Sequence, residues 1–392
     1  MKLKFLALSA FILASCEGGN LVSIDASSLI GNTTTSDEIF RKISASRNHA
    51  CALMYSGDVR CWGLGDNREL GRVLTISVSA VASAVPGLSG VTSVAVGEKT
   101  SCAATVNAIY CWGSNAYGSL GTGSATTVKT ETPQAVTGWS SLASAPILAG
   151  GYSHYCAVNA TSGAASCWGK NTDGYLGDGT TTDRATPVAV SGASSGVTAI
   201  GAASSGSHSC AIISGALKCW GYGASGQLGN GSTTTSSVPV AVTGVTGVSK
   251  VALGGAHSCA LTAGGDVYCW GNAEANGAAV DLSTATKVSG IAGATDIAAG
   301  TEHSCALVGG AVKCWGSNSW GQLGNGTTGD SITPVTVNGL ATVSSIAAGG
   351  NFSCAVTDSG SAYCWGDNNY GQLGNSAIST SSSKIPVQVR TD

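Results

Sequence analysis

Residues 303–316 read HSCALVGGAVKCWG, and this short stretch decides the fold. The apolar residues on either side of Gly309-Gly310 predict two short strands joined by a two-residue hairpin turn. In that register Cys305 lies opposite Cys314 at a non-hydrogen-bonded site. Cα atoms at such a site are about 4.5 Å apart, which is within the range of a disulfide. The stretch therefore predicts a β-hairpin closed by its own disulfide.

The same hairpin pattern recurs along the chain. Cys-Trp-Gly begins seven times, at Cys61, Cys111, Cys167, Cys219, Cys269, Cys314 and Cys364, and another cysteine precedes each copy by nine to eleven residues. Successive copies are 45 to 56 residues apart, a period typical of propeller blades or solenoid turns. Seven copies favour a closed ring. We therefore expect an all-β fold, a seven-bladed β-propeller of about 50-residue repeats that forms a single domain over residues 39–392.

Each blade should contain one disulfide. The expected pairs are Cys51-Cys61, Cys102-Cys111, Cys156-Cys167, Cys210-Cys219, Cys259-Cys269, Cys305-Cys314 and Cys354-Cys364. Zinc is the competing interpretation, because a histidine precedes five of these pairs by two residues. Structural zinc sites usually use a Cys-x2-4-Cys knuckle, which these pairs lack. The copies with Thr100 and Phe352 in place of histidine also keep both cysteines, so we expect no metal and no cofactor.

The N-terminus predicts export. Lys2 and Lys4 precede an apolar run over residues 5–14, which is too short to span a bilayer and suits a signal peptide. The run ends in Leu-Ala-Ser before Cys16, and this resembles a bacterial lipobox. The resemblance implies a signal peptide over residues 1–15 and lipidation of Cys16. An ordinary signal peptide with a stray cysteine is the alternative.

Residues 16–38 have no periodicity and are interpreted as the lipidated cysteine followed by a polar tether. Glu17 is not aspartate, which by resemblance to lipoprotein sorting rules favours the outer membrane. Disulfides in this number require an oxidising compartment. We therefore expect a bacterial cell-envelope protein that contacts the membrane through its lipid anchor alone.

Composition excludes several classes of function. Only 10% of residues are charged, against about 25% in typical proteins, and no basic stripe exists that would predict a nucleic-acid partner. Residues 192–196, Gly-Ala-Ser-Ser-Gly, formally match a nucleophile elbow, but they lack the strand-to-helix context that this motif needs. We therefore expect no catalytic residues and no enzyme activity.

A second motif recurs after each Cys-Trp-Gly. It reads Gly-Gln-Leu-Gly at residues 226–229, 321–324 and 371–374, with altered copies in the other blades. The whole repeat resembles that of the regulator of chromosome condensation family, a seven-bladed β-propeller. The paired cysteines are absent from the signature of its nuclear members and mark a secreted branch. Nucleotide exchange on a small GTPase is the activity that the resemblance implies, but the lipoprotein signal separates this chain from cytosolic GTPases.

Ring closure can also be predicted. Pro-Val segments occur between blades, none precedes the first blade at Ile39, and a last copy stands at residues 385–389 after the seventh. We therefore expect this C-terminal strand to close the ring by pairing beside N-terminal strands.

Two sets of residues are candidates for binding. All the histidines occupy one repeat position: His49, His154, His208, His257 and His303. They are either structural, bonded to an adjacent blade, or they line a funnel that binds a ligand or senses pH. In the resembled family this strand end lies near the partner-binding face.

The other candidates are loop aromatics, which are Trp139, Tyr117, Trp320 and Tyr370. They suit recognition of a protein or a glycan, and semi-buried packing is the alternative. The sequence thus predicts a monomeric, lipid-anchored binding scaffold for an unknown protein or glycan. A carbohydrate-binding adhesin and an inhibitor of a secreted or periplasmic enzyme are the alternatives.

Overall fold

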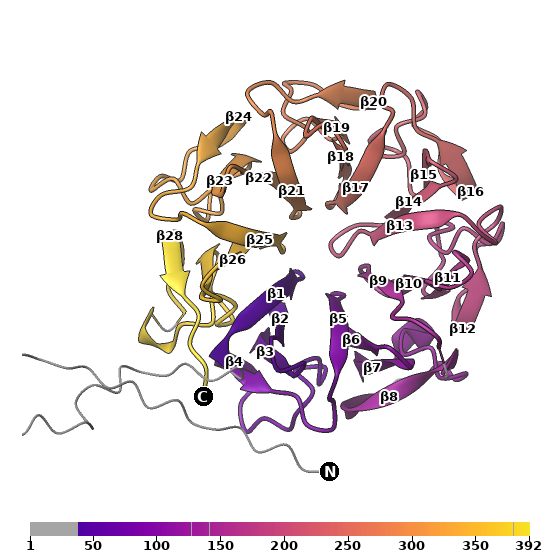
Figure 1. Ribbon diagram of the computed structural model, residues 1–392, viewed down its shortest axis with the longest axis horizontal. Coiled ribbons are helices and arrows are strands. Elements are labelled where there is room, and N and C mark those ends of the chain that lie inside the picture. Colours follow the sequence, from indigo (N-terminus) through magenta and orange to yellow (C-terminus); the bar gives the residue numbers. More distant parts are fainter. Residues whose placement is uncertain (1–37, 127, 141, 379) are drawn as a thin grey trace, which may run out of the picture. The chain divides into compact units, whose positions relative to one another are not determined.

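The structure, a computed structural model, describes residues 38–126, 128–140, 142–378 and 380–392. These residues form seven antiparallel sheets of four strands each, arranged as blades around a central axis (Figure 1). The predicted seven-bladed, all-β propeller is confirmed. The predicted signal peptide, Cys16 and nearly all of the tether lie outside the described residues. Within the described part of the chain, no helix combines the length and apolar character needed to cross a bilayer.

Every blade is built from four strands that are consecutive in the sequence. Blades 1 and 2 contain β1 (Phe40–Ala45), β2 (His49–Met54), β3 (Val59–Leu64) and β4 (Val78–Ala84), then β5 (Val91–Val96), β6 (Thr100–Thr105), β7 (Ala108–Ser114) and β8 (Lys129–Ser140). Blades 3 and 4 contain β9 (Ile147–Gly150), β10 (His154–Val158), β11 (Ala165–Gly169) and β12 (Arg184–Ala189), then β13 (Val197–Ala202), β14 (His208–Ile213), β15 (Ala216–Gly221) and β16 (Ser236–Ala241).

The remaining blades repeat this order. Blade 5 contains β17 (Val248–Leu253), β18 (His257–Thr262), β19 (Val267–Gly271) and β20 (Leu282–Lys287). Blade 6 contains β21 (Ala294–Ala299), β22 (His303–Val308), β23 (Ala311–Gly316) and β24 (Ser331–Thr336). Blade 7 contains β25 (Val343–Ala348), β26 (Phe352–Thr357), β27 (Ala362–Gly366) and β28 (Ser383–Gln388). Among the described residues, two short 3-10 turns, η3 (Ala116–Gly118) and η4 (Ser376–Ile378), lie in loops.

Position within the blade decides burial. The second strand is covered on both sides by neighbouring blades, and every residue of β2, β14 and β26 is buried. The fourth strand forms the outer rim and is only half-buried, as in β16 and β24. Because the interior lies between blades, its side chains must be apolar or paired, which accounts for the low content of charge.

The cysteines lie in the expected hairpins. Cys305 is directly opposite Cys314, and the same opposition recurs in all seven blades. Cα atoms in each pair are 4.0 to 4.1 Å apart, as at non-hydrogen-bonded sites of a sheet. The disulfides of the described residues are Cys51-Cys61, Cys102-Cys111, Cys156-Cys167, Cys210-Cys219, Cys259-Cys269, Cys305-Cys314 and Cys354-Cys364.

Proline protects most of the outer edges. It occupies the same position in five fourth strands, as Pro133, Pro187, Pro239, Pro334 and Pro386. Proline has no N–H, so it leaves no free donor on an exposed edge. β4 and β20 carry alanine there instead. The N–H of Ala82 donates to the carbonyl of Arg390 at 2.8 Å, and that of Ala285 donates to Thr243 at 3.0 Å. At this position of the edge, the two donors that proline does not remove are therefore hydrogen-bonded.

Ring closure differs from the prediction. β28 pairs with β27 and completes the seventh blade, so the expected pairing of residues 385–389 with N-terminal strands is wrong. The reason is that each sheet uses consecutive strands, and the seventh needs its own fourth strand. The residues after β28 reach blade 1 instead, through a parallel bridge between Ala82 and Thr391 and an ion pair of 3.2 Å between Arg60 and Asp392. In Figure 1 the C-terminus accordingly lies beside β4.

Candidate functional site

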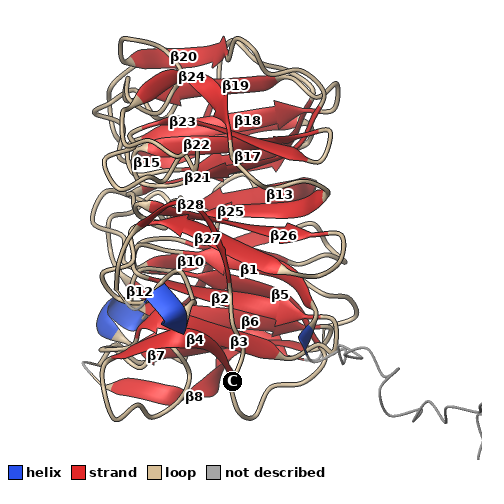
Figure 2. Ribbon diagram, turned by 90° about the vertical axis from the view of Figure 1, so that its left-hand side faces the viewer, coloured by secondary structure: helices blue, strands red, loops and turns tan. Residues whose placement is uncertain are grey.

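The propeller has two unlike faces, seen at the left and right of Figure 2. One face, called here the long-loop face, carries the loops that join first to second and third to fourth strands. They share a side because His49, at the start of β2, pairs with Gly63, near the end of β3. The opposite face, the short-turn face, carries the hairpin turns and is where the chain enters β1, since the carbonyl of Ile39 accepts the N–H of Tyr55 in the β2–β3 turn.

The inner loops of the long-loop face are joined to one another. The N–H of Tyr152 donates to Ala203 of the next blade at 2.8 Å, and that of Thr301 donates to Gly350 at 3.0 Å. Gly350 in turn donates to Ser46 at 3.0 Å, across the junction between the last and first blades. These hydrogen bonds join the inner loops into a rigid rim around the mouth of the central channel, which runs along the propeller axis.

The histidines lie inside the blade interfaces. None has exposed surface. Each Nε2 is 2.8 to 2.9 Å from a serine hydroxyl of the following blade, in the pairs His49–Ser101, His154–Ser209, His208–Ser258, His257–Ser304 and His303–Ser353. Every one of these serines donates its own proton to a backbone carbonyl. The hydroxyl must therefore accept from the imidazole, which fixes the neutral tautomer with a proton on Nε2.

Burial keeps these imidazoles neutral. It lowers the pKa to about 3 for His49, His154, His208 and His257, and to about 4 for His303. A neutral side chain with no exposed surface cannot meet a ligand or respond to pH near neutrality. The histidine-lined funnel is therefore wrong, and the structural interpretation describes these residues.

In the two blades without this histidine, the partner serine of the following blade is replaced as well. At the junction of blades 2 and 3, Thr100 replaces histidine and Tyr155 replaces serine, and the Tyr155 hydroxyl donates to the Thr100 carbonyl at 2.6 Å. At the junction of blades 7 and 1, Phe352 stands for histidine and Ala50 for serine, and both are completely buried in one cluster. Histidine is thus present only where the next blade offers the hydroxyl.

The tryptophans and the glutamine motif belong to the same contact. The carbonyl of Gln227 accepts both Ser258 Oγ and Trp270 Nε1 at 2.8 Å. The carbonyl of Gln322 accepts Ser353 and Trp365 in the same way. All seven tryptophans of Cys-Trp-Gly are fully buried and donate to the preceding blade. The tryptophans therefore pack the blades against one another.

The loop aromatics divide into two groups. Trp139 lies on β8, is 6% exposed and packs in one cluster with Leu148 and Tyr155, so its role as a contact residue is wrong and the packing alternative describes it. Tyr117, Trp320 and Tyr370 are 45%, 40% and 38% exposed. All three lie in third-to-fourth loops of the long-loop face.

Sequence reasoning missed a fourth aromatic of this face. Tyr222 directly follows the fourth Cys-Trp-Gly and is 40% exposed. Its position in the repeat was the available signal, because β15 ends at Gly221 and the next residue starts the loop.

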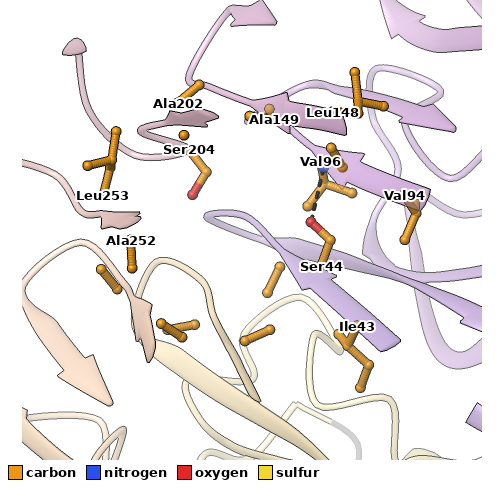
Figure 3. A pocket seen from close by; sticks show the side chains of 18 of the residues that line it. Ile43, Ser44, Val94, Val96, Leu148, Ala149, Ala202, Ser204, Ala252 and Leu253 are labelled. Carbon is orange, nitrogen blue, oxygen red and sulfur yellow. Dashed lines mark hydrogen bonds between the residues drawn. The ribbon is translucent and has the colours of Figure 1, made fainter. Parts of the chain in front are cut away.

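The channel is mostly apolar, and Lys42 is the one ionisable residue that lines its cavity. Its cavity, of about 210 Å³, is lined largely by alanine, valine and leucine of the first strands (Figure 3). The hydroxyl of Ser44 already accepts the N–H of Val96 at 3.2 Å. Among the described residues, no three histidine, cysteine, aspartate or glutamate side chains cluster so as to hold a metal ion.

These features define a disulfide-bonded β-propeller whose blades are joined by a repeated histidine–serine–tryptophan contact. The chain belongs to the regulator of chromosome condensation (RCC1) repeat family. The model of the RCC1-like domain matches residues 148–391, and that of the RCC1 repeat matches residues 40–69 and 107–158.

Two plant proteins of similar sequence match about half of their own length to this chain. The ultraviolet-B receptor UVR8 of Arabidopsis thaliana is 33% identical over 238 residues, which cover 58% of this chain and 52% of the receptor. The RCC1 domain-containing protein RUG3 of the same plant, a mitochondrial protein, is 28% identical over 264 residues, covering 62% and 56%. The chain thus spans about half the length of these relatives.

Solved structures share the fold at low identity. Human WBSCR16 superposes with a TM-score of 0.75 at 21% identity, covering 85% of this chain and 94% of that one. Prp20p of Saccharomyces cerevisiae gives a TM-score of 0.72 at 20% identity, covering 92% and 90%. These likenesses concern the architecture alone.

Proposed function

We propose that this protein is an extracytoplasmic binding scaffold that holds a protein partner on its long-loop face. The observation that carries the proposal is the set of exposed aromatic residues on that face, Tyr117, Tyr222, Trp320 and Tyr370. Tyrosine and tryptophan are enriched at the centres of protein interfaces, because they bury a large area at a small cost in side-chain entropy. The rigid rim below them would lower the cost of binding further.

Proteins of the same fold support a protein partner. Prp20p has been studied for its binding to Gsp1p and histones, and Kap60 has been crystallised bound to yeast RCC1. At about 20% identity these names do not transfer a partner to this chain. We do not propose nucleotide exchange, because the predicted export would separate the protein from cytosolic GTPases. We propose no enzyme activity either.

The location is part of the proposal. Seven disulfides support an oxidising compartment. We propose the bacterial cell envelope, with lipidation of Cys16 and anchoring in the outer membrane. Since the chain enters β1 on the short-turn face, a tether from Cys16 would join the propeller opposite the exposed aromatics.

The anchor can be tested separately from binding. Cys16→Ala should leave a folded propeller but release it from the membrane fraction, because acyl chains hold the protein and the blades do not depend on them. Fractionation after a high-salt wash measures this. A variant that stays with the membrane would refute lipidation at Cys16.

Binding is tested by affinity capture from envelope extracts with residues 17–392. The triple variant Tyr222→Ser, Trp320→Ser, Tyr370→Ser should lose the captured protein. Tyr55→Ser is the matched control, because Tyr55 is 61% exposed but lies on the short-turn face. Equal capture by the triple variant and the wild type would contradict the proposal. Loss of glycan binding in the triple variant, without any protein ligand, would favour the adhesin alternative.

A further inference from the structure

A polar pocket lies on the long-loop face where the repeat is broken. It has a volume of about 240 Å³ and is formed by loops of the first three blades. Thr100 lines it, at the position that holds histidine in five other blades. The large Tyr155 takes the place of serine below and bonds to the Thr100 carbonyl. The pocket therefore coincides with the one junction at which threonine and tyrosine replace the histidine–serine pair.

Two lysines line this pocket without an anionic partner. Lys170 Nζ lies 5.3 Å from the ring centroid of Tyr117 and 5.9 Å from that of Tyr152. Lys99 is exposed at the rim. No ion pair of the described residues includes either lysine. Their charges are therefore available to a ligand.

One carboxylate, that of Glu98, lines the pocket, and it is paired through one oxygen. The Glu98 side chain is 10% exposed, its Oε1 lies 3.5 Å from Nη1 of Arg47, and its Oε2 is buried without a hydrogen-bond partner. Arg47 offsets the charge of Glu98, so Lys99 and Lys170 leave the pocket net positive. An anionic group is the complement of such a site.

Tyr117, whose ring lines the pocket, has a strained backbone conformation. Tyr117 has a φ of +62°, in the left-handed region that costs a non-glycine residue energy. The neighbouring residue, Gly118, packs against the Ala185 backbone. Only glycine fits there, because a Cβ at position 118 would be 2.4 Å from the Ala185 Cα. This close contact with blade 3 fixes the turn, which places the Tyr117 ring beside Lys170.

We propose that this pocket, the Lys99–Lys170 pocket, receives an aspartate or glutamate side chain of a protein partner bound on the long-loop face. The inference rests on the proposed function of that face. A carboxylate would bond to the two ammonium groups, and the two tyrosine rings would cover its aliphatic stem. The protein partner proposed for that face supplies the carboxylate, and an acidic glycan is tested below as the other source.

The test uses two blocked nonapeptides that differ only in charge, one with three glutamates and one tyrosine, the other with glutamines instead. Affinities are measured by calorimetry at low and at physiological salt. The wild type should bind the acidic peptide at least about tenfold more tightly than its neutral match, and less tightly as salt rises. Lys99→Gln, Lys170→Gln should lose that preference. The charge-matched control Lys313→Gln, Lys384→Gln, outside the pocket, should keep it.

Three results would overturn the inference. They are equal affinity for both peptides, an undiminished preference in Lys99→Gln, Lys170→Gln, and binding of a glucuronate oligosaccharide without binding of the acidic peptide. Near-ultraviolet circular dichroism checks that the variants are folded. If the lysine variant still captures a partner that the aromatic variant loses, the inference fails and the proposed function stands. If both variants capture it, the proposed function itself fails.

Discussion

At the scale of single residues, Glu69 places a carboxyl group where three other blades carry glutamine. Its Oε2 accepts the N–H of Asn67 at 2.6 Å, just as Gln322 Oε1 accepts that of Trp320 at 2.9 Å. The other oxygen, Oε1, is buried without a hydrogen-bond partner. Burial, followed by repulsion from Asp66, raises the pKa of Glu69 to about 7, against an ordinary value of 4.5. The ionised form is therefore unfavourable in the folded state.

Glu69→Gln should stabilise the protein at pH 8 by up to about 3 kcal/mol. The raised pKa means that the folded state binds the proton more tightly than the unfolded state. The contribution of Glu69 to the free energy of unfolding is therefore complete below about pH 4.5 and is lost as the pH rises to about 7. Urea unfolding of both proteins at several pH values measures the difference. A difference that does not grow between pH 4.5 and 7 would contradict this account.

The histidine–serine contact makes a second prediction at this scale. Ser258→Ala should destabilise the protein by about 1–3 kcal/mol, because the buried Nε2–H of His208 loses its acceptor. The double variant His208→Phe, Ser258→Ala copies the pair Phe352 and Ala50, and it should recover part of the loss. A double-mutant cycle from urea unfolding measures the coupling. A coupling near zero would show that the two side chains act independently.

At the scale of the element, each blade contains a hairpin with its own covalent link. The link joins second and third strands that are already paired, so it limits the unfolded chain more than it shapes the folded one. Because the linked residues are only 9 to 11 positions apart, a blade can form its disulfide from local contacts alone. The hairpin is thus the part of the blade that depends least on its neighbours.

Replacing Cys305 and Cys314 by serine should destabilise the protein by about 2–3 kcal/mol in the chain-entropy model. The estimate follows from the short loop, since the two residues are 9 positions apart. Unfolding in denaturant without reductant measures it. Peptide mapping of the unreduced parent is the control, and a dominant bridge between blades would contradict the assignment.

At the scale of the molecule, the ring is closed by packing and by the last residues of the chain. The cluster at this junction combines Phe40, Met54 and Trp62 of blade 1 with Phe352 and Leu373 of blade 7. Val389, just after β28, is 4% exposed and belongs to the same cluster. The segment that directly follows β28 is therefore part of the interface between blades 7 and 1.

Deleting residues 384–392 should lower the melting temperature far more than a terminal deletion usually does. The deletion removes most of β28 and exposes the edge of β27. Deleting residues 390–392 alone should have a smaller effect, because it removes only the backbone bonds of Arg390 with Ala82 and Gly374, the Thr391 bridge and the Arg60 ion pair. Thermal unfolding and light scattering compare the two. A long deletion that matches the parent in both would refute this closure.

The sequence by itself determined the features that depend on residues close together along the chain. Hairpin spacing predicts the strands and the opposed cysteines, and the repeat length predicts seven blades. The folded structure decided the burial of the histidines and Trp139, the sheet that β28 joins and the pocket beside Thr100. These depend on partners in other blades, such as His208 and Ser258, which are 50 residues apart. No single repeat specifies such a partner, because the free energy of the contact exists only once two blades are packed together.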